Sequence, residues 1–419
     1  MDGLSVWFLA AGSLLLLMAV IGAAIERLPV SPAIVYLAFG FLLGPGAFGL
    51  LEIDLESHRS LIRAIAEVGV VLSLFSVGLR LGVPLRDSAW RVPLLLVGPA
   101  MVLTIAGGAL AGWAIFGLGA GAAILLASIV APTDPVLASE LQLKHPTERD
   151  RVRFGLTAEG GMNDGLAAVG IVLGLALLDP VETVAPAIVR EVAWSVPAGV
   201  VLGALCGTAF ARVALSLRRH GRSTPGLEVF LVLGLIALAY GLASMVRAEG
   251  FLAVFAAGVA VRRIERRASA QAGPSPAAQE TAGAPAAMAH ALLVFNRQIE
   301  RIAEVVVVVM AGALLDAALF DWRAWAFAFA MLLVVRPAAV ALGVAGAPLS
   351  PRERRLLQWF GVRGIGSLYW LAFALERHVA GADTVVLATA TLTVIAASVL
   401  AHGVSATPVM DWHLRRRRA

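Results

Sequence analysis

The sequence predicts an all-α polytopic membrane protein with about 13 transmembrane helices, arranged as two inverted six-helix repeats whose interrupted helices cross near the membrane midplane. Three observations support this prediction. Hydrophobic residues make up 59% of the chain, charged residues only 15%, and the mean hydropathy is +0.87, a balance that excludes an ordinary soluble domain. Apolar windows of about 20 residues follow one another along the chain. Arginines gather at alternate ends of these windows.

Each apolar window is a candidate span. The first run, Leu4 to Ala24, has no basic segment before it, so we expect a retained helix rather than a cleaved signal. In chain order, the expected spans are 4–24, 30–50, 61–80, 92–117, 119–142, 152–178, 186–216, 226–246, 249–262, 290–315, 322–347, 353–376 and 383–406. Residues 1–419 then form a single transmembrane domain.

Two segments depart from membrane composition. Residues 263–289 begin with basic residues and continue as a stretch rich in Ala, Pro, Gly and Ser, so we expect a flexible cytoplasmic loop. Residues 407–419 end in consecutive arginines and are expected to form a short basic cytoplasmic tail.

The arginine pattern indicates how the chain is oriented. One set of span ends carries most of the basic residues, whereas the alternate ends carry few. Because loops rich in Lys and Arg stay in the cytoplasm, this favours an odd number of spans in the cell inner membrane, with the N-terminus outside and the C-terminus cytoplasmic. Nucleic-acid binding is not expected, since the arginines form no groove-reading motif.

Two spans contain signals that interrupt a helix. Pro132-Thr133-Asp134-Pro135 lies within 119–142, and Gly361-Val362-Arg363-Gly364 lies within 353–376. These are the fifth spans of the two halves, so we expect two broken helices that meet in the membrane. Asp134 would offset the positive ends of the half-helices, and Arg363 the negative ends. Simple helix packing is the alternative reading of each break.

Buried charges are unusual in such a chain and indicate function, because a carboxylate within the bilayer is costly unless it is paired or neutralised. The span 152–178 carries Glu159, Asn163 and Asp164. Asn163 lies one turn after Glu159 on the same face, and Asp164 is rotated onward. The buried acids are expected to be Glu67, Asp134, Glu159 and Asp164, and the buried arginines Arg336 and Arg363.

This inventory leaves one acid free. Two acids can pair with the two arginines, helix ends compensate Asp134, and Asp164 has no fixed partner. An unpaired buried carboxylate takes a proton or a cation, and competition between the two is the minimal machinery of an antiporter. Because the neighbouring Asn163 is neutral, a one-for-one, electroneutral exchange is expected. Glu67, Glu159 and Asn163 remain open between structural and ion-contacting roles at this point.

Other classes of function fit the sequence less well. An ion channel would need a continuous polar pore or a carbonyl-lined filter, and none is recognisable. The histidines lie mostly at or beyond span ends, so neither an enzyme nor a bound cofactor is expected.

The polar motifs resemble those of a known family. Thr133-Asp134-Pro135 followed by Glu159-x-x-x-Asn163-Asp164 is similar to the monovalent cation/proton antiporters of the NhaP and sodium/proton exchanger branch. Further matches are Glu67-x-Gly69 through Phe75-x-x-Gly78-Leu79 and the pair Arg363-Gly364. The resemblance implies an NhaA-like antiporter fold, in which a six-helix core moves against a dimerisation domain, usually within a homodimer.

The resemblance also implies roles for individual residues. Asp164 would bind the cation or the proton, and Thr133 would be a second ligand of the bound metal ion. Asn163 would stabilise the assembly. Asn163 and Asp134 are further candidates for contact with the cation or the proton. Structural ion pairs are expected between Glu159 and Arg336 and between Glu67 and Arg363.

One position departs from the family pattern. Gly160 stands where the family usually has a serine whose hydroxyl can help to ligate the ion. Na⁺, Li⁺ and K⁺ therefore all remain open as the bound ion. The expected activity is exchange of Na⁺, or of Li⁺, for H⁺, with K⁺/H⁺ exchange on the same scaffold as the alternative and an ion channel as a further one.

Overall fold

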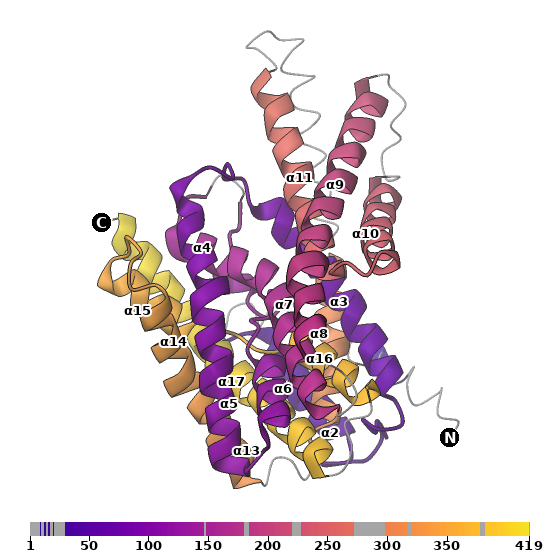
Figure 1. The fold of residues 1–419 in the computed structure, drawn as a ribbon, viewed down its shortest axis with the longest axis vertical. Coiled ribbons are helices and arrows are strands. Elements are labelled where there is room, and N and C mark those ends of the chain that lie inside the picture. Colours follow the sequence, from indigo (N-terminus) through magenta and orange to yellow (C-terminus); the bar gives the residue numbers. More distant parts are fainter. Residues whose placement is uncertain are drawn as a thin grey trace.

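The chain is described by a computed structural model that covers residues 30–145, 148–179, 184–219, 228–271, 298–316, 321–377 and 382–418, together with single residues before 30. Within these residues helices are the only regular secondary structure (Figure 1). The predicted all-α class is confirmed. The expected span at 4–24 lies outside the described residues, apart from a few single positions.

The described helices follow the predicted windows closely. Their bounds are α2 Pro32–Leu43, α3 Arg59–Arg80, α4 Arg91–Leu95, α5 Met101–Phe116, α6 Ala120–Val130, α7 Arg151–Leu178, α8 Val184–Arg190, α9 Val196–Arg219, α10 Glu228–Met245, α11 Gly250–Gln271, α13 Trp322–Phe329, α14 Arg336–Gly343, α15 Pro351–Trp359, α16 Ile365–Glu376 and α17 Ala382–Arg418. Residues 298–313 are also helical.

Several of these helices join into membrane-length rods through short π-helical turns. Such turns occur at Leu96–Ala100, which contains Pro99, at Glu191–Ser195 and at Ala330–Val335. A proline cannot donate to the helical ladder, and a π turn absorbs the local misfit without ending the helix. Six helical stretches of the described chain are long and apolar enough to cross a membrane, and four shorter apolar helices accompany them. The protein is therefore an integral, multi-pass membrane protein, as predicted.

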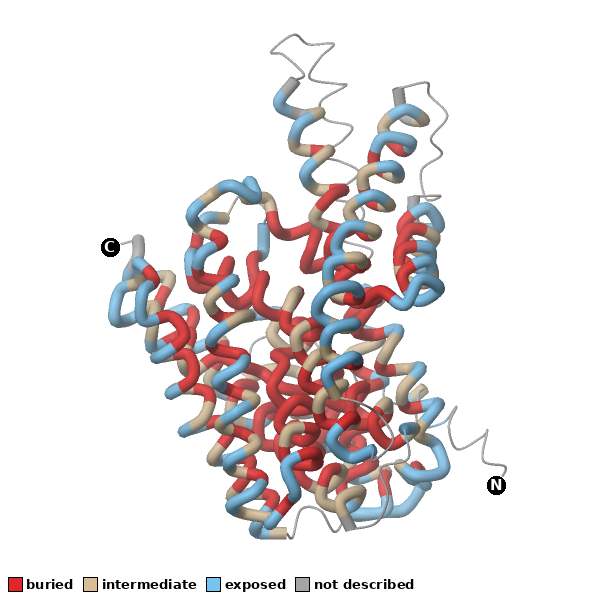
Figure 2. Tube along the Cα trace, in the orientation of Figure 1, coloured by how far each residue is buried: buried red, intermediate tan, exposed pale blue. Residues whose placement is uncertain are grey.

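Burial is concentrated where the helices cross. Figure 2 shows buried residues at the centre of the molecule, around α6, α7 and α16, and exposed residues on the outer faces of the helices. Many exposed residues are large and apolar, for example Leu110, Trp113, Phe230 and Leu238. Such a surface suits contact with hydrocarbon rather than with water.

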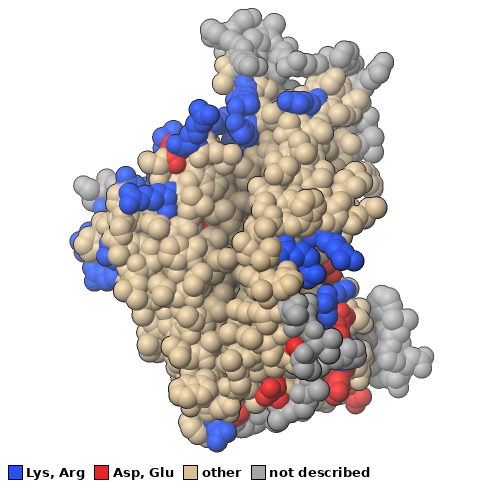
Figure 3. Space-filling model, in the orientation of Figure 1, with Lys and Arg blue, Asp and Glu red and all other residues tan. Residues whose placement is uncertain are grey.

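Charges divide between the two ends of the molecule. Figure 3 shows Lys and Arg side chains mainly along the upper and upper left edges and Asp and Glu side chains mainly at the lower right, with a second basic group at mid-height on the right and a broad uncharged band on the left. The ends of α9, α11 and α17 lie at the upper end (Figure 1). The arginine-rich loops inferred from the sequence thus share one end of the fold.

Two predicted boundaries need correction. The loop expected at 263–289 begins later, because α11 continues as a helix to Gln271, and 272–289 lies outside the described residues. The helix expected at 383–406 also continues, since α17 runs to Arg418 through Pro408. The predicted tail at 407–419 is therefore helical as far as the structure describes it. Helices that project beyond the bilayer cannot be told from loops by hydropathy alone.

Helices α9 and α11 pack through a column of glycines. Gly199, Gly203 and Gly207 on α9 lie directly against three backbone carbonyls, those of Glu249 just before α11 and of Ala253 and Ala257 on α11. Both columns repeat every four residues, so the same face of each helix meets the other. Small residues at this spacing allow close backbone approach in membranes.

Enlarging the central glycine of this column should destabilise the protein. A Cβ at Gly203 would overlap the carbonyl oxygen of Ala253, so Gly203→Val forces the two backbones apart. Overpacking of this kind costs about 1–3 kcal/mol. We expect a lower thermal midpoint in detergent, measured by size-exclusion chromatography after heating. Gly241→Ala on α10 is the matched control, because nothing lies within 4 Å of the added Cβ. Equal midpoints for both variants would contradict the proposed packing.

Candidate functional site

Two broken helices meet at the centre of the fold. Helix α6 ends at Val130, and the chain continues through bends and turns before a short 3-10 helix at Ser139–Leu141. Helix α15 ends at Trp359, and α16 begins at Ile365. The two breaks touch, because the backbone N–H of Asp134 donates to the carbonyl of Val362 at 2.7 Å. The predicted interruptions are confirmed, although the first break is followed by turns rather than by a second long half-helix.

Asp134 neutralises the start of α16. Its Oδ2 accepts from the backbone N–H of Ile365, and its Oδ1 accepts from Val136 at 2.8 Å and Leu137 at 3.3 Å. These are amide groups that a helix start or a turn leaves without backbone partners. The carboxylate is buried and lies at the positive end of α16. This is the position in which its negative charge offsets the positive end of the half-helix, the role predicted for Asp134.

Arg363 binds carbonyl groups at the two breaks, which carry the opposite partial charge. It is completely buried, and its Nε donates to the carbonyl of Val130, at the end of α6, at 3.0 Å. Its Nη1 donates to the carbonyl of Gly361. The guanidinium thus carries positive charge to the carbonyl end of one half-helix and to the second break.

The expected pair between Glu67 and Arg363 is wrong. Glu67 accepts a hydrogen bond from the hydroxyl of Tyr240 and lies 4.0 Å from Arg63 on its own helix. Its side chain is 21% exposed, so the charge of Glu67 is not fully buried and does not need Arg363 to neutralise it. Arg363 donates instead to backbone carbonyls through Nε and Nη1, and its Nη2 has no hydrogen-bond partner among the described residues.

Glycines make room for these charges. A Cβ at Gly364 would lie 2.6 Å from Oδ2 of Asp134, and one at Gly361 would lie 2.9 Å from Nε of Arg336. Both separations are too short for real atoms. The glycines of the second break are therefore required by close approach, and not only by weak helix propensity.

Glu159 and Arg336 form a buried ion pair. Each side chain is 3% exposed, and two hydrogen bonds join them, one of them from Nη2 to Oε2 at 2.9 Å. Nη2 also donates to the carbonyls of Phe360 at 2.9 Å and Leu357 at 3.3 Å. Arg336 follows the π-helical turn at Ala330–Val335. One guanidinium thus links α14, α7 and the end of α15.

Asn163 bridges to the first break. Its Nδ2 donates to Oγ1 of Thr133 at 2.7 Å, and both residues are buried. The amide oxygen of Asn163 has no hydrogen-bond partner among the described residues. The amide therefore holds the Thr133 hydroxyl in place and leaves one buried oxygen unused.

Asp164 is a buried acid that neither an arginine nor a backbone amide neutralises in the described part of the chain. It is 2% exposed, and its Oδ1 accepts from the indole N–H of Trp370 at 3.3 Å. A Cβ at Gly366 would lie 3.2 Å from Oδ1, so the carboxyl faces the first turn of α16. Asp134 bonds to the same turn at Ile365. The two acids therefore flank the start of one half-helix.

The site offers few ligands to an ion. Within the described residues no three His, Cys, Asp or Glu side chains gather as a metal site. A bound cation would rely on Asp164 together with neutral oxygens, for which Thr133 and Asn163 are the nearest predicted candidates. One carboxylate with neutral oxygens suits a hard, singly charged cation better than a strongly bound transition metal.

A polar cavity reaches the site from one side. It has a volume of about 640 Å³, and its lining includes Asp179, Glu191, Glu249, Arg377 and Trp370. Trp370 therefore separates Asp164 from this cavity while it holds the carboxyl. Glu249 is 8% exposed and accepts from the backbone N–H of Leu252 at the start of α11.

The sequence reasoning missed Glu249 and Trp370. Glu249 is the first residue of the expected span 249–262, where it resembles the edge of a span, although an acid that close to an apolar run is a usable signal. Trp370 lies in an apolar stretch, and nothing in the sequence separates it from a lipid-facing aromatic residue.

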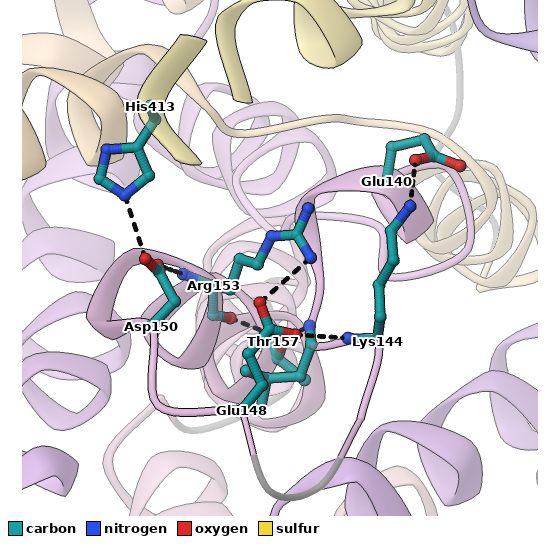
Figure 4. A network of polar contacts seen from close by, with 8 residues as sticks. Glu140, Lys144, Glu148, Asp150, Arg153, Thr157 and His413 are labelled. Atoms are coloured by element: carbon teal, nitrogen blue, oxygen red, sulfur yellow. Dashed lines mark hydrogen bonds and ion pairs between the residues drawn. The ribbon is translucent and has the colours of Figure 1, made fainter. Parts of the chain in front are cut away.

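A second polar network fixes the start of α7. Asp150 caps this helix by accepting from the N–H of Arg153 at 2.9 Å, and its other oxygen lies 3.1 Å from Nε2 of His413 on α17 (Figure 4). Arg153 in turn pairs with Glu148 at 3.2 Å. The helix that carries the candidate site is thus tied at its arginine-rich end to the C-terminal part of α17.

Comparisons with known proteins agree with this geometry. Residues 13–412 match the sequence profile of the family described as "Sodium/hydrogen exchanger, transmembrane". The fold is shared with the sodium proton antiporter MjNhaP1 of Methanocaldococcus jannaschii, solved at pH 8, with a TM-score of 0.73 and 18% identity over 96% of this chain and 98% of that one.

Curated relatives carry names for two different cations. The K(+)/H(+) antiporter NhaP2 of Shewanella sp. (strain MR-4) is 24% identical over 91% of this chain. The Na(+)/H(+) antiporter 2 of Zygosaccharomyces rouxii is 27% identical over 56% of this chain and 30% of its own length. This chain spans 63% of the length of the Shewanella relative.

Removing the charge of Glu159 should lower stability. Glu159→Gln leaves Arg336 buried without its carboxylate, and breaking a buried pair in this way costs about 3–5 kcal/mol. We expect a marked fall in the thermal midpoint in detergent. Glu140→Gln is the control, because its partner Lys144 is about as exposed as Glu140 itself, at 52% and 49% (Figure 4), and such pairs contribute about 0–1 kcal/mol. A midpoint for Glu159→Gln that equals the control would contradict a structural role for the pair.

Proposed function

Because the chain belongs to the sodium/hydrogen exchanger family, we propose that it exchanges a monovalent cation for a proton across the membrane by alternating access. Asp164 binds the cation or the proton. The observation that carries this proposal is the difference between the three buried acids at the crossing: Arg336 neutralises Glu159, the start of α16 holds Asp134, and within the described residues Asp164 accepts only from the indole N–H of Trp370.

The exchange follows from the electrostatics of Asp164. An ionised carboxylate within the bilayer is costly, so the group is stable there when a proton or a cation neutralises it. Either ligand gives the site the same net charge. The helices that carry the site can then reorient in both loaded states, and the two ligands travel in opposite directions. The proposal is for transport and not for catalysis.

A one-for-one stoichiometry is proposed from Asn163. This neighbour is neutral and is engaged with Thr133, so one carboxylate titrates at the centre of the site. One cation then replaces one proton, and the cycle moves no net charge.

Na⁺ is the proposed cation, with Li⁺ on the same site and K⁺ as the alternative. The solved protein MjNhaP1, which shares the fold, is a sodium proton antiporter, whereas the Shewanella relatives are named K(+)/H(+) antiporters. Gly160 bears on this choice, because a Cβ there would lie 3.6 Å from the carbonyl oxygen of Thr133. A side-chain hydroxyl at this position would reach the candidate ligands, and this chain lacks it.

Orientation and assembly are proposed as well. We place the arginine-rich end in the cytoplasm of the cell that carries the protein in its inner membrane, with the N-terminus outside, because basic loops are retained on that side. The resemblance to the family favours a homodimer, for which the exposed apolar helix faces offer surface.

Exchange should disappear when Asp164 loses its charge. Asp164→Asn keeps the size of the side chain but cannot bind a proton or balance a cation. We expect that adding Na⁺, K⁺ or Li⁺ to proteoliposomes under a pH gradient changes the internal pH for the wild type and not for this variant, as followed by a pH-sensitive dye. Glu140→Gln is the folded control and should remain active.

An imposed membrane potential completes the experiment. Electroneutral exchange should proceed at the same rate with and without it. Full activity of Asp164→Asn would move the binding role elsewhere, and a steep voltage dependence would contradict the one-for-one stoichiometry.

Restoring the missing hydroxyl should change the preference for the cation. Gly160→Ser adds an oxygen beside Thr133, and a Cβ at Gly160 meets only ordinary contacts, the nearest at 3.4 Å to Pro135. An additional ligand of this kind corresponds to roughly a 2- to 10-fold change in the ratio of Na⁺ to K⁺ affinities, measured as half-saturation concentrations. Gly160→Ala isolates the effect of the methyl group and should leave the ratio unchanged. If serine and alanine act alike, the hydroxyl is irrelevant to ion choice.

A further inference from the structure

A second cavity lies between the helices that carry the site and the pair α9 and α11. Its volume is about 600 Å³, and its walls are formed by apolar side chains from α4, α7, α9 and α11, including Leu94, Met162, Val200, Phe255 and Val259. Unlike the cavity beside Glu249, it contains no acidic residue in its lining. It is a groove for hydrocarbon rather than for a hydrated ion.

The mouth of this groove is basic. Arg212 on α9 and Arg263 and Arg267 on α11 belong to its lining, and all three are exposed. Arg263 and Arg267 are one turn apart, so they share a face of α11. No ion pair joins any of the three to an acid in the described part of the chain. Figure 3 shows the basic side chains of this end above a hollow between the α4 and α9 sides of the molecule.

The basic mouth and the apolar walls of the groove together indicate which kind of ligand it can bind. Three guanidinium groups repel a cation and attract a phosphate, which arginine binds with several donors. The apolar walls below them require a hydrocarbon tail. The depth is also appropriate: from Arg263 to Leu252, which lines the inner part, α11 rises about 16 Å, close to half of a hydrocarbon core of about 30 Å. This is the depth of one leaflet.

We propose that this groove binds an anionic phospholipid from the arginine-rich leaflet. The headgroup phosphate lies among Arg212, Arg263 and Arg267, and one acyl chain extends along α9 and α11 to α7. The tail then contacts Met162 and Gly165, which lie on either side of Asn163 and Asp164 in the sequence. Binding of the lipid does not depend on the proposed exchange activity, so it can be tested by binding alone.

The test is native mass spectrometry of the full chain in detergent, titrated separately with phosphatidylglycerol and phosphatidylcholine of identical acyl chains. We expect selective retention of phosphatidylglycerol. Replacing the three arginines together (R212Q, R263Q, R267Q) should weaken its binding on the order of 100-fold, because each basic residue near an anionic headgroup contributes roughly a 5-fold factor. The matched control removes three exposed arginines that do not line the groove (R149Q, R352Q, R355Q) and should leave binding unchanged.

A second variant tests the apolar part while the charge stays constant. Val200 lines the groove and is 43% exposed, so Val200→Trp can fill the groove without entering the core. It should reduce the retention of phosphatidylglycerol although all arginines remain. Glycerol phosphate, which has the headgroup without tails, serves as the competitor and should displace the lipid poorly.

Four results would overturn the proposal. Equal retention of phosphatidylcholine would remove the role of the arginines. Unchanged binding in Val200→Trp, or full displacement by glycerol phosphate, would reduce the site to a surface anion contact. Equal losses in the triple variant and its control would show only a general charge effect. Each variant is first checked for a wild-type elution profile and thermal midpoint.

Discussion

The structure depends on one constraint, that backbone groups released inside a membrane must find partners within the protein. Two helices are broken at the same depth, and each break exposes amides on one side and carbonyls on the other. Asp134 takes the amides at the start of α16, and Arg363 takes the carbonyl at the end of α6. The charges are therefore part of the backbone scaffold, and they allow two irregular segments to meet in a region where neither could exist alone.

The same constraint determines which acid can work. Arg336 binds the carbonyls of Leu357 and Phe360 as well as Glu159, so that carboxylate is committed to holding α15 and α7 together. Asp134 is committed to α16. Asp164 faces the same turn of α16, but within the described residues it accepts a hydrogen bond only from the indole N–H of Trp370. Asp164 is thus the acid at this crossing that the proposed exchange would use.

Much of this arrangement could be predicted from the sequence, because composition places helices, and proline and glycine place breaks. Counting charges indicated that two acids could pair with two arginines, and the family resemblance implied the pair of Glu159 with Arg336. The pairing of Glu67 with Arg363, which the resemblance implied, was wrong because Arg363 donates to the backbone carbonyls of Val130 and Gly361 instead, and a list of charged side chains omits such acceptors. Trp370 and Glu249 escaped notice because their roles depend on which cavity the packing of α11 and α16 creates, and no local pattern encodes that.

The glycine column between α9 and α11 has a consequence for how this family of sequences can vary. Gly199 lies against the backbone of Glu249, the acid that lines the polar cavity. The wall of that cavity is therefore in direct main-chain contact with α9. A larger residue on the contact face of α9 requires the backbone of α11 to move away. We therefore expect substitutions on the two contact faces to occur together in related sequences. We also expect α9 and α11 to move together, with Glu249 as part of their contact.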